Sequence, residues 1–368
     1  MSSTRFRFGR ATRADEPEIR ALVGSVVMPG TVSVRFGRDP DYFLGTTIQG
    51  RPCDVLIARQ QKDGALAGVM VRAERQVYLD GRPARVAYIG QIRIAPRFQG
   101  RWLMQRAALE LAELRDRSIP YFGVIARDNP VALGAITGTR PPGGATIERI
   151  ARARSLAFVL HRRFVRRPRS LDVRQGDADH LAEIIAFLNR HGPARQLFPV
   201  VKPAEFLDGE TYRGLRLEDL SIVWRDGEVA GVLGAWDQAA YKQEILDADT
   251  PRLRRLRPVY DLMARAIGGR RLPVPGEPIR TAFGCLRCTV DDDPDVFATL
   301  LRAARDRALE QGQAFLLVGF DEREPLLRTL GRRLALTYES DVFLGSLTGA
   351  VSTSTLDGRA VHIEVATL

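Results

Sequence analysis

The chain has 368 residues, a length that suits two domains of ordinary size, and 45% of its residues are hydrophobic while 27% are charged. This composition excludes a disordered, collagen-like or disulfide-rich chain. The net charge of +11 favours an anionic partner such as a phosphorylated cofactor, nucleic acid or a membrane surface, unless a GC-rich genome supplied arginine by default. No stretch approaches the roughly 18 apolar residues of a membrane span, and the first residues lack the apolar segment of a signal peptide. We therefore expect a soluble, cytoplasmic protein.

The first half of the chain reads as alternating strands and helices. A helix is expected within residues 10–23, and a turn at Asp63 and Gly64 precedes an apolar strand. The next elements are a fourth strand over residues 85–94, a long helix from Pro96 to about Arg117, a fifth strand over Tyr121–Ala126, a helix starting near Asn129, and final strands.

The second half repeats this order. RATRADEPEIRALV (residues 10–23) is similar to RQGDADHLAEIIAFL (174–188), and DGALAGVMV from Asp63 is similar to DGEVAGVLG from Asp226. Further along, QRAALELAEL from Gln105 is similar to LRAARDRALE from Leu301. The offset rises from about 163 to about 196 along the chain, which indicates about 32 extra residues in the second copy.

These repeats predict an α/β fold, of the mixed-sheet α+β kind, built from two tandem domains. Each domain is a mixed, mostly antiparallel sheet flanked by helices, and the domains cover residues 1–165 and 166–368. The arginine-rich stretch LHRRFVRRPRSL (160–171) contains the boundary. The second domain carries the insertion at about residues 242–276 and ends in a closing strand within GRAVHIEVATL (358–368).

Between the fourth strand and the long helix lies the sequence IRIAPRFQGRWLM (92–104). This loop, in this order of elements, resembles the GNAT superfamily of acyl-CoA N-acyltransferases, duplicated in tandem. GNAT proteins carry [Q/R]-x-x-G-x-[G/A] at this point, and its amides bind the CoA pyrophosphate. The resemblance implies that acetyl-CoA or another acyl-CoA binds here, with Asn129 facing the pantetheine arm. The implied cofactor-binding residues are Ile92, Arg93, Ile94, Arg97, Gln99, Gly100, Arg101, Trp102, Leu103, Met104 and Asn129.

Physical chemistry agrees with this interpretation, because a helix N-terminus with unpaired amides is an anion site, and Arg97 and Arg101 add positive charge. The loop departs from the family pattern at Trp102 and Met104, where small residues are usual. Their Cβ atoms narrow the approach to the backbone. The alternative is an ordinary helix cap with Trp102 in the core.

The second copy lacks these features. Four aspartates crowd its helix start, at Asp291, Asp292, Asp293 and Asp295, and Glu324 stands near the position of Asn129. Carboxylates at a helix N-terminus already use its positive end and repel pyrophosphate. We therefore expect the second copy to be a partner that shapes the site of the first, rather than a second CoA site.

N-acyl transfer requires a polarised thioester carbonyl, a neutral amine and a proton for the thiolate. Backbone amides of residues 91–94 can polarise the carbonyl. The fourth strand has no carboxylate, so Tyr88 and Tyr121 are the nearby proton donors, or else core and wall residues.

The acceptor side is harder to place. The predicted substrate-cleft residues are Gln91 of the fourth strand and Trp236, Asp237 and Gln238 of GAWDQAAYKQE (234–244), a segment that also contains Tyr241 and Lys242. This segment forms either the wall of an acceptor cleft or a polar turn with a buried tryptophan. No metal site is expected. Cys285 and Cys288 are spaced CxxC, but residues three apart on a strand face opposite ways.

The sequence therefore predicts an acyl-CoA-dependent N-acyltransferase acting on an amine of a small molecule or protein. The alternative is a non-catalytic CoA-binding sensor or scaffold with the same fold. The basic stretches at residues 152–169 and 252–271 suit nucleic acid or acidic lipid, or else are solvated faces and a linker. We expect no specific nucleic-acid partner and no membrane insertion.

Overall fold

The computed structural model describes residues 5–28, 33–99, 103, 110, 116–137, 146–161, 171–249, 251–330, 335–348 and 356–368. Gly100, Arg101, Trp102 and Met104 of the predicted pyrophosphate loop lie outside the described residues. Most of the long helix predicted after Pro96 and most of the arginine-rich boundary also lie outside them.

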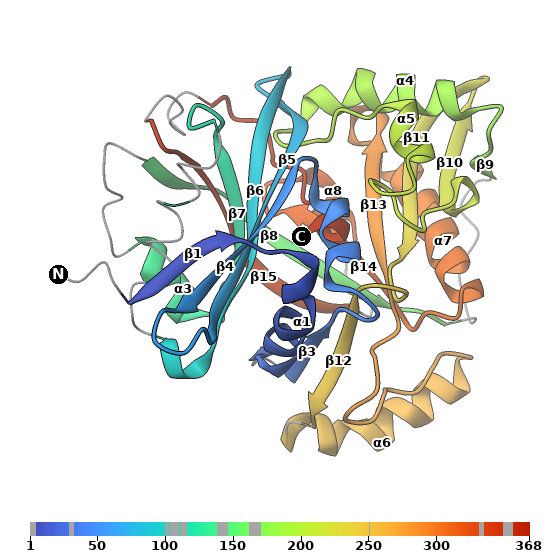
Figure 1. The fold of residues 1–368 in the computed structure, drawn as a ribbon. Helices are drawn as coiled ribbons and strands as arrows, with labels where there is room; N and C mark the ends of the chain where they lie inside the picture. The colour runs from blue at the N-terminus through green and yellow to red at the C-terminus, as the bar shows by residue number, and fades with distance from the viewer. Residues whose placement is uncertain are drawn as a thin grey trace.

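The first half of the chain forms the predicted series of strands and helices (Figure 1). The turn at Asp63 and Gly64 joins two antiparallel strands, and the fourth and fifth predicted strands are present. The elements are β1 (Phe6–Arg10), α1 (Glu16–Ser25), β2 (Val27–Met28), β3 (Ser33–Gly37), β4 (Cys53–Gln60), β5 (Leu66–Leu79), β6 (Arg82–Ile94), β7 (Tyr121–Ala126), α3 (Pro130–Thr137) and β8 (Thr146–Val159).

The second half repeats the series, and its turn at Asp226 and Gly227 has both residues at positive φ, as a tight hairpin requires. The elements are β9 (Asp172–Gln175), α4 (Leu181–His191), α5 (Pro203–Leu207), β10 (Leu220–Arg225), β11 (Glu228–Asp237), β12 (Gln243–Ala248), α6 (Pro251–Ala266), β13 (Thr281–Thr289), α7 (Pro294–Glu310), β14 (Phe315–Asp321), α8 (Pro325–Thr329) and β15 (Ala335–Ser346).

One twelve-stranded sheet runs through both halves, in the order β1-β4-β5-β6-β7-β15-β8-β14-β13-β11-β10-β9. The last strands are exchanged: β15 of the second half pairs with β7 of the first, and β8 of the first half pairs with β14 of the second. The two strands also pair with each other. The two units therefore share one sheet rather than having the separate sheets that we expected.

The repeat is regular at the centre of each unit. In the first unit β6 and β7 pair in parallel at Ala87 and Tyr121, and in the second β13 and β14 pair in parallel at Ala282 and Leu316. The strand pairs thus correspond at one common offset, which confirms the internal repeat.

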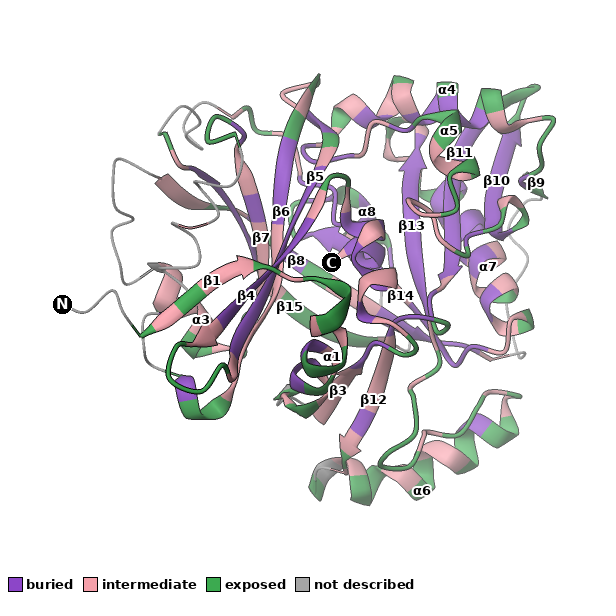
Figure 2. Cartoon of the chain, in the orientation of Figure 1, coloured by how far each residue is buried: buried purple, intermediate pink, exposed green. Residues whose placement is uncertain are grey.

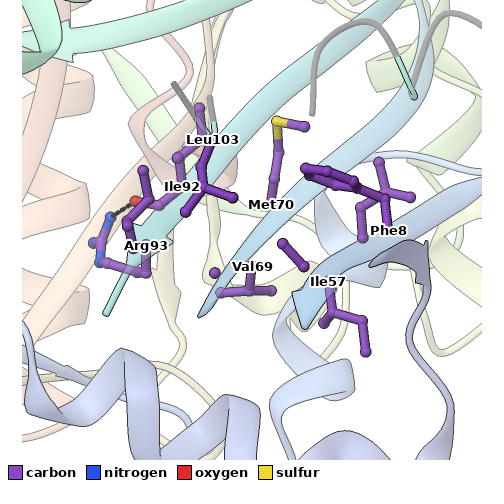
Figure 3. A pocket seen from close by; sticks show the side chains of 11 residues that line it. Phe8, Ile57, Val69, Met70, Ile92, Arg93 and Leu103 are labelled. Carbon is purple, nitrogen blue, oxygen red and sulfur yellow. Dashed lines mark hydrogen bonds between the residues drawn. The ribbon is translucent and has the colours of Figure 1, made fainter. Parts of the chain in front are cut away.

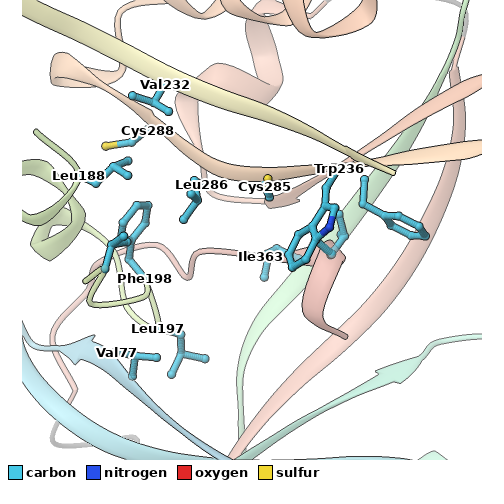
Figure 4. Close-up of a cluster of buried hydrophobic side chains, with 14 of the residues drawn as sticks. Val77, Leu188, Leu197, Phe198, Val232, Trp236, Cys285, Leu286, Cys288 and Ile363 are labelled. Carbon is cyan, nitrogen blue, oxygen red and sulfur yellow. The ribbon is translucent and has the colours of Figure 1, made fainter. Parts of the chain in front are cut away.

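The insertion of the second unit contains β12 and α6 (Figure 1). Strand β12 crosses to the first unit and pairs with β3, so a small sheet, β12-β3-β2, also joins the units. Buried side chains from both units form one cluster between them, which includes Val77, Phe198, Trp236 and Ile363 (Figure 4). The strands of the large sheet are mostly buried (Figure 2).

Two expectations are corrected. The closing strand predicted in residues 358–368 is wrong: this tail forms one bridge at Val361 and a 3-10 turn over Val365–Thr367. Its alternating pattern arises because Val361, Ile363 and Val365 pack into the cluster between the units, without a neighbouring strand.

The argument that Cys285 and Cys288 face opposite ways is also wrong. A bulge with Leu286 at φ 52° lies between them, and it brings both thiols into one buried cluster.

Candidate active site

Strands β6 and β7 pair over only the first part of β7 and then separate, and we call this separation the splay. The strands pair only at Ala87–Tyr121 and Tyr88–Phe122, although β6 continues to Ile94 and β7 to Ala126. Within the described part of the chain, the facing edges therefore form no ladder beyond Tyr88. Backbone groups along these edges are available to a ligand that enters between the strands.

A bulge marks the start of this splay. Val71 lies opposite Gly90 and Val69 lies opposite Arg93, so β6 carries one extra residue there. Gln91 has φ 51°, in the left-handed region that non-glycine residues seldom adopt. Bulges re-aim backbone and side chains next to active sites. The predicted oxyanion stretch, residues 91–94, therefore begins at the bulge.

Tyr88 points toward the bulge. A Cβ on Gly90 would lie 2.1 Å from the Tyr88 hydroxyl oxygen, so the ring runs along the strand over a residue without a side chain. The Arg75 guanidinium lies 5.5 Å from the centre of the Tyr88 ring. Burial raises the pKa of Tyr88, and the hydroxyl therefore carries its proton at neutral pH.

On the other side of the splay, β7 presents a bare backbone at Gly123. A Cβ there would lie 3.1 Å from the carbonyl oxygen of Ile89. Glycine within a strand often marks a place where a ligand or another backbone approaches closely.

In the second unit strands β13 and β14 also separate after a short pairing, next to a bulge at Leu286. There, other side chains and the C-terminal tail occupy both places. Val318 occupies the position of Gly123 and is only 1% exposed. The amide of Leu286, at the bulge, donates to the Glu364 carboxylate at 2.9 Å. A Cβ on Gly319 would lie 2.5 Å from the carbonyl oxygen of Ile363, which shows how closely the C-terminal tail covers β14.

The helix start of the second unit is also used internally. The Asp293 carboxylate accepts from the amides of Asp295 and Val296 at the start of α7. Glu324 is fully buried and makes a bidentate ion pair with Arg287. The amides that would bind an anion therefore already have a carboxylate partner.

No protein-family model matches the chain, and no curated protein matches its sequence. Solved structures do match. N-myristoyltransferase of Saccharomyces cerevisiae with bound myristoyl-CoA superposes with a TM-score of 0.62 at 10% identity, over 99% of this chain and 90% of that one. A GCN5-related N-acetyltransferase from Sphaerobacter thermophilus has a TM-score of 0.57 at 10% identity and full coverage of both chains. A glucosamine N-acetyltransferase region of a fungal multi-domain protein has a TM-score of 0.59 at 12% identity, over 94% of this chain and 38% of that one.

The chain has the GNAT fold. The GNAT splay between β6 and β7 in the first unit and between β13 and β14 in the second confirms the expected tandem arrangement.

The described part of the predicted CoA loop lies at the end of the GNAT splay. Ile92, Arg93 and Ile94 form the last residues of β6, and Arg97 and Gln99 are exposed beyond it. Leu103 is buried against Phe98 and borders a small apolar pocket of about 20 Å³ with Met70 (Figure 3).

Asn129 lies directly before α3, close to the predicted helix start. Its side-chain oxygen accepts from the Ala132 amide at 3.1 Å, which caps the helix. The cap uses the oxygen and fixes the orientation of the amide group.

A larger cavity, of about 160 Å³, lies between the units on the Tyr88 face of the sheet. It is lined by Glu74 and Arg75 of the first unit and by Glu205, Tyr212 and Trp236 of the second. Arg75 lines this cavity, and its guanidinium also lies 5.5 Å from the centre of the Tyr88 ring. Burial raises the pKa of Glu205.

The other predicted site residues are divided. Trp236 lines the cavity and donates from its indole to the Arg213 carbonyl. Gln238 is fully buried and donates to the Ala366 carbonyl, while Asp237 accepts from the Ala239 amide. Neither of these two is among the residues that line the described cavity.

Tyr121 lies at the closed end of the splay, where it pairs with Ala87. Its hydroxyl donates to the Thr146 carbonyl at 3.4 Å. The structure thus brings Tyr88 to the bulge and Tyr121 to the wall.

One further titratable group, Lys242, belongs to the segment predicted as a possible cleft wall, and another, Glu205, was missed. Lys242 is buried, donates to the carbonyl oxygens of Ala366 and Leu368, and lies 4.6 Å from the centre of the Phe283 ring. Burial lowers its pKa to about 7. Glu205 was missed because it lies more than a hundred residues from the bulge, on a short helix without a motif. Only the fold brings it to the cavity.

Proposed function

We propose that this protein is an acyl-CoA-dependent N-acyltransferase whose first unit holds acyl-CoA in the splay between β6 and β7. The observation that carries the proposal is the contrast between the units. In both units the pairing ends early at a bulge, but the first unit has Gly123 where the second has the buried Val318, and Glu364 and Ile363 cover the bulge and β14 of the second. In this arrangement the pyrophosphate lies at the loop from Gln99 to Met104.

The reaction then follows from the groups around the bulge. The acceptor nitrogen attacks the thioester carbon, the C–N bond forms, and the C–S bond breaks with its electron pair on sulfur. Amides at Gln91 and Ile92 stabilise the negative charge on the carbonyl oxygen. The Tyr88 hydroxyl, which the raised pKa keeps protonated, gives its proton to the thiolate, and the proton that the nitrogen loses as the amide forms restores the Tyr88 hydroxyl.

The acceptor enters through the cavity between the units. Its ammonium must lose a proton before attack, and Glu205 is the candidate base because burial raises its pKa and so increases its basicity. The acceptor is an amine of a small molecule or a protein. Asn129 contacts the CoA arm, with Arg97 at the rim.

The acyl chain is either acetyl or longer, since the similar structures include a myristoyl-CoA complex and acetyltransferases. The test incubates the full chain with acetyl-CoA or myristoyl-CoA and a panel of amines and peptides. Mass spectrometry detects the acylated product. Product from the wild type, and none from Gly123→Val, supports the proposal.

A second candidate is a CoA-binding protein without catalysis, which the lack of any Asp or Glu in β6 favours. Tight acyl-CoA binding with no product from any acceptor would establish this candidate and reject the enzyme.

A further inference from the structure

Helix α6 lies at the lower edge of the view in Figure 1, and Tyr260 packs it against strands β8 and β14 of the large sheet. Its inner side is held to the insertion by polar contacts. Arg257 pairs with Asp249 and donates to the Pro273 carbonyl at 2.8 Å, and Asp261 accepts from the Leu272 amide at 3.0 Å. Ala264 is 2% exposed on this side.

Many residues of α6 are exposed (Figure 2), and four of them are large and apolar. Leu256 is 51% exposed, Val259 56%, Leu262 71% and Met263 46%. The last three follow Leu256 by three, six and seven residues, and this spacing places all four side chains on one stripe of the helix. A continuous stripe of large apolar side chains in water marks an interaction surface rather than scattered exposure.

Positive charge surrounds this stripe. Residues 251–271 contain seven arginines and one aspartate, a net charge of +6 out of +11 for the whole chain. Arg254, Arg255, Arg265, Arg270 and Arg271 are all exposed. More than half of the net charge therefore lies in a small part of the chain, which a general preference for arginine does not explain.

We infer that α6 binds an anionic lipid surface, with the apolar stripe buried at the boundary between headgroups and acyl chains. An exposed apolar face flanked by arginines is the pattern of helices that lie in a membrane interface. None of the described helices is long and apolar enough to cross a bilayer, so the contact is with the surface. Binding of a second copy of the chain through α6 would bring two strongly positive faces together. Nucleic acid would neutralise the arginines but would not bury the exposed leucines.

The test is co-sedimentation of the full chain with vesicles of phosphatidylcholine, alone or with about a third of phosphatidylglycerol. We expect binding only to the anionic vesicles, weakened by salt. Each arginine near such a surface contributes about a fivefold factor, so Arg254→Gln with Arg255→Gln lowers the affinity by roughly 25-fold.

Leu262→Gln removes binding, whereas Leu207→Gln does not, because Leu207 is 79% exposed on α5 and outside the stripe. Circular dichroism confirms that both variants are folded. Equal binding to neutral vesicles, no binding at low salt, or equal effects of the two leucine variants would overturn the proposal. So would a concentration-dependent dimer that Leu262→Gln abolishes.

Discussion

Gly123→Val fills the open splay of the first unit with the side chain that the second unit has at the matching position. The new Cβ lies 3.1 Å from the Ile89 carbonyl oxygen, so the backbone must yield by a few tenths of an ångström. If acyl-CoA binds as proposed, the valine methyl groups occupy the path of its pantetheine arm.

The ligand must displace the valine before it can bind, and a displacement cost of about 1–3 kcal/mol, the usual range for overpacking, corresponds to roughly 5- to 150-fold in the dissociation constant of acyl-CoA. The matched control is Val318→Ala in the second unit. It removes two buried methyl groups and lowers the free energy of unfolding by roughly 2–3 kcal/mol, with no change in acyl-CoA affinity.

Both variants are compared with the wild type by calorimetric titration of CoA and by urea denaturation. We expect Gly123→Val to lose affinity and keep most of its stability, and Val318→Ala to do the reverse. A folded Gly123→Val protein with wild-type affinity would refute the placement of acyl-CoA in this splay.

Three further variants test the chemistry and the buried charges. Tyr88→Phe lowers kcat about a hundredfold and leaves CoA affinity unchanged. Tyr121→Phe retains activity, because the Tyr121 hydroxyl only donates to the Thr146 carbonyl. Equal losses in the two variants would show that Tyr88 is not the proton donor. Glu205→Gln can still accept the hydrogen bond from the Lys202 amide, but it cannot act as a base. We therefore expect most of kcat to be lost, together with the decrease of kcat at acidic pH. An unchanged pH profile would show that another group is the base. Lys242→Met tests linkage: the folded state holds Lys242 at a pKa of about 7 against an ordinary 10.5, so it binds fewer protons than the unfolded state between these values. The wild type should therefore gain up to about 1.4 kcal/mol of unfolding free energy per pH unit relative to Lys242→Met across that window, and parallel curves would contradict the buried charge.

Local patterns were enough to predict the repeat and most of the elements. The DG turns, the apolar strands and the fourth and fifth strands of the first unit were visible because each is decided by neighbouring residues. The contrast at Asp293 and Asn129 was also readable, since caps depend on the first turn of a helix.

The exchange of β8 and β15 was not predictable, because either strand presents the same alternating pattern to either neighbour. The tail was misread for a similar reason: Ile363 and Val365 alternate toward a buried cluster without a strand partner. The bulges at Gln91 and Leu286 depend on a positive φ, and because neither residue is a glycine the sequence does not indicate this conformation.

The most direct test of the central claim is the stoichiometry of CoA binding to the wild-type chain, measured by isothermal titration calorimetry. The open first splay and the filled second splay predict one CoA per chain. Two equivalent sites, or no binding at millimolar CoA, would contradict the account.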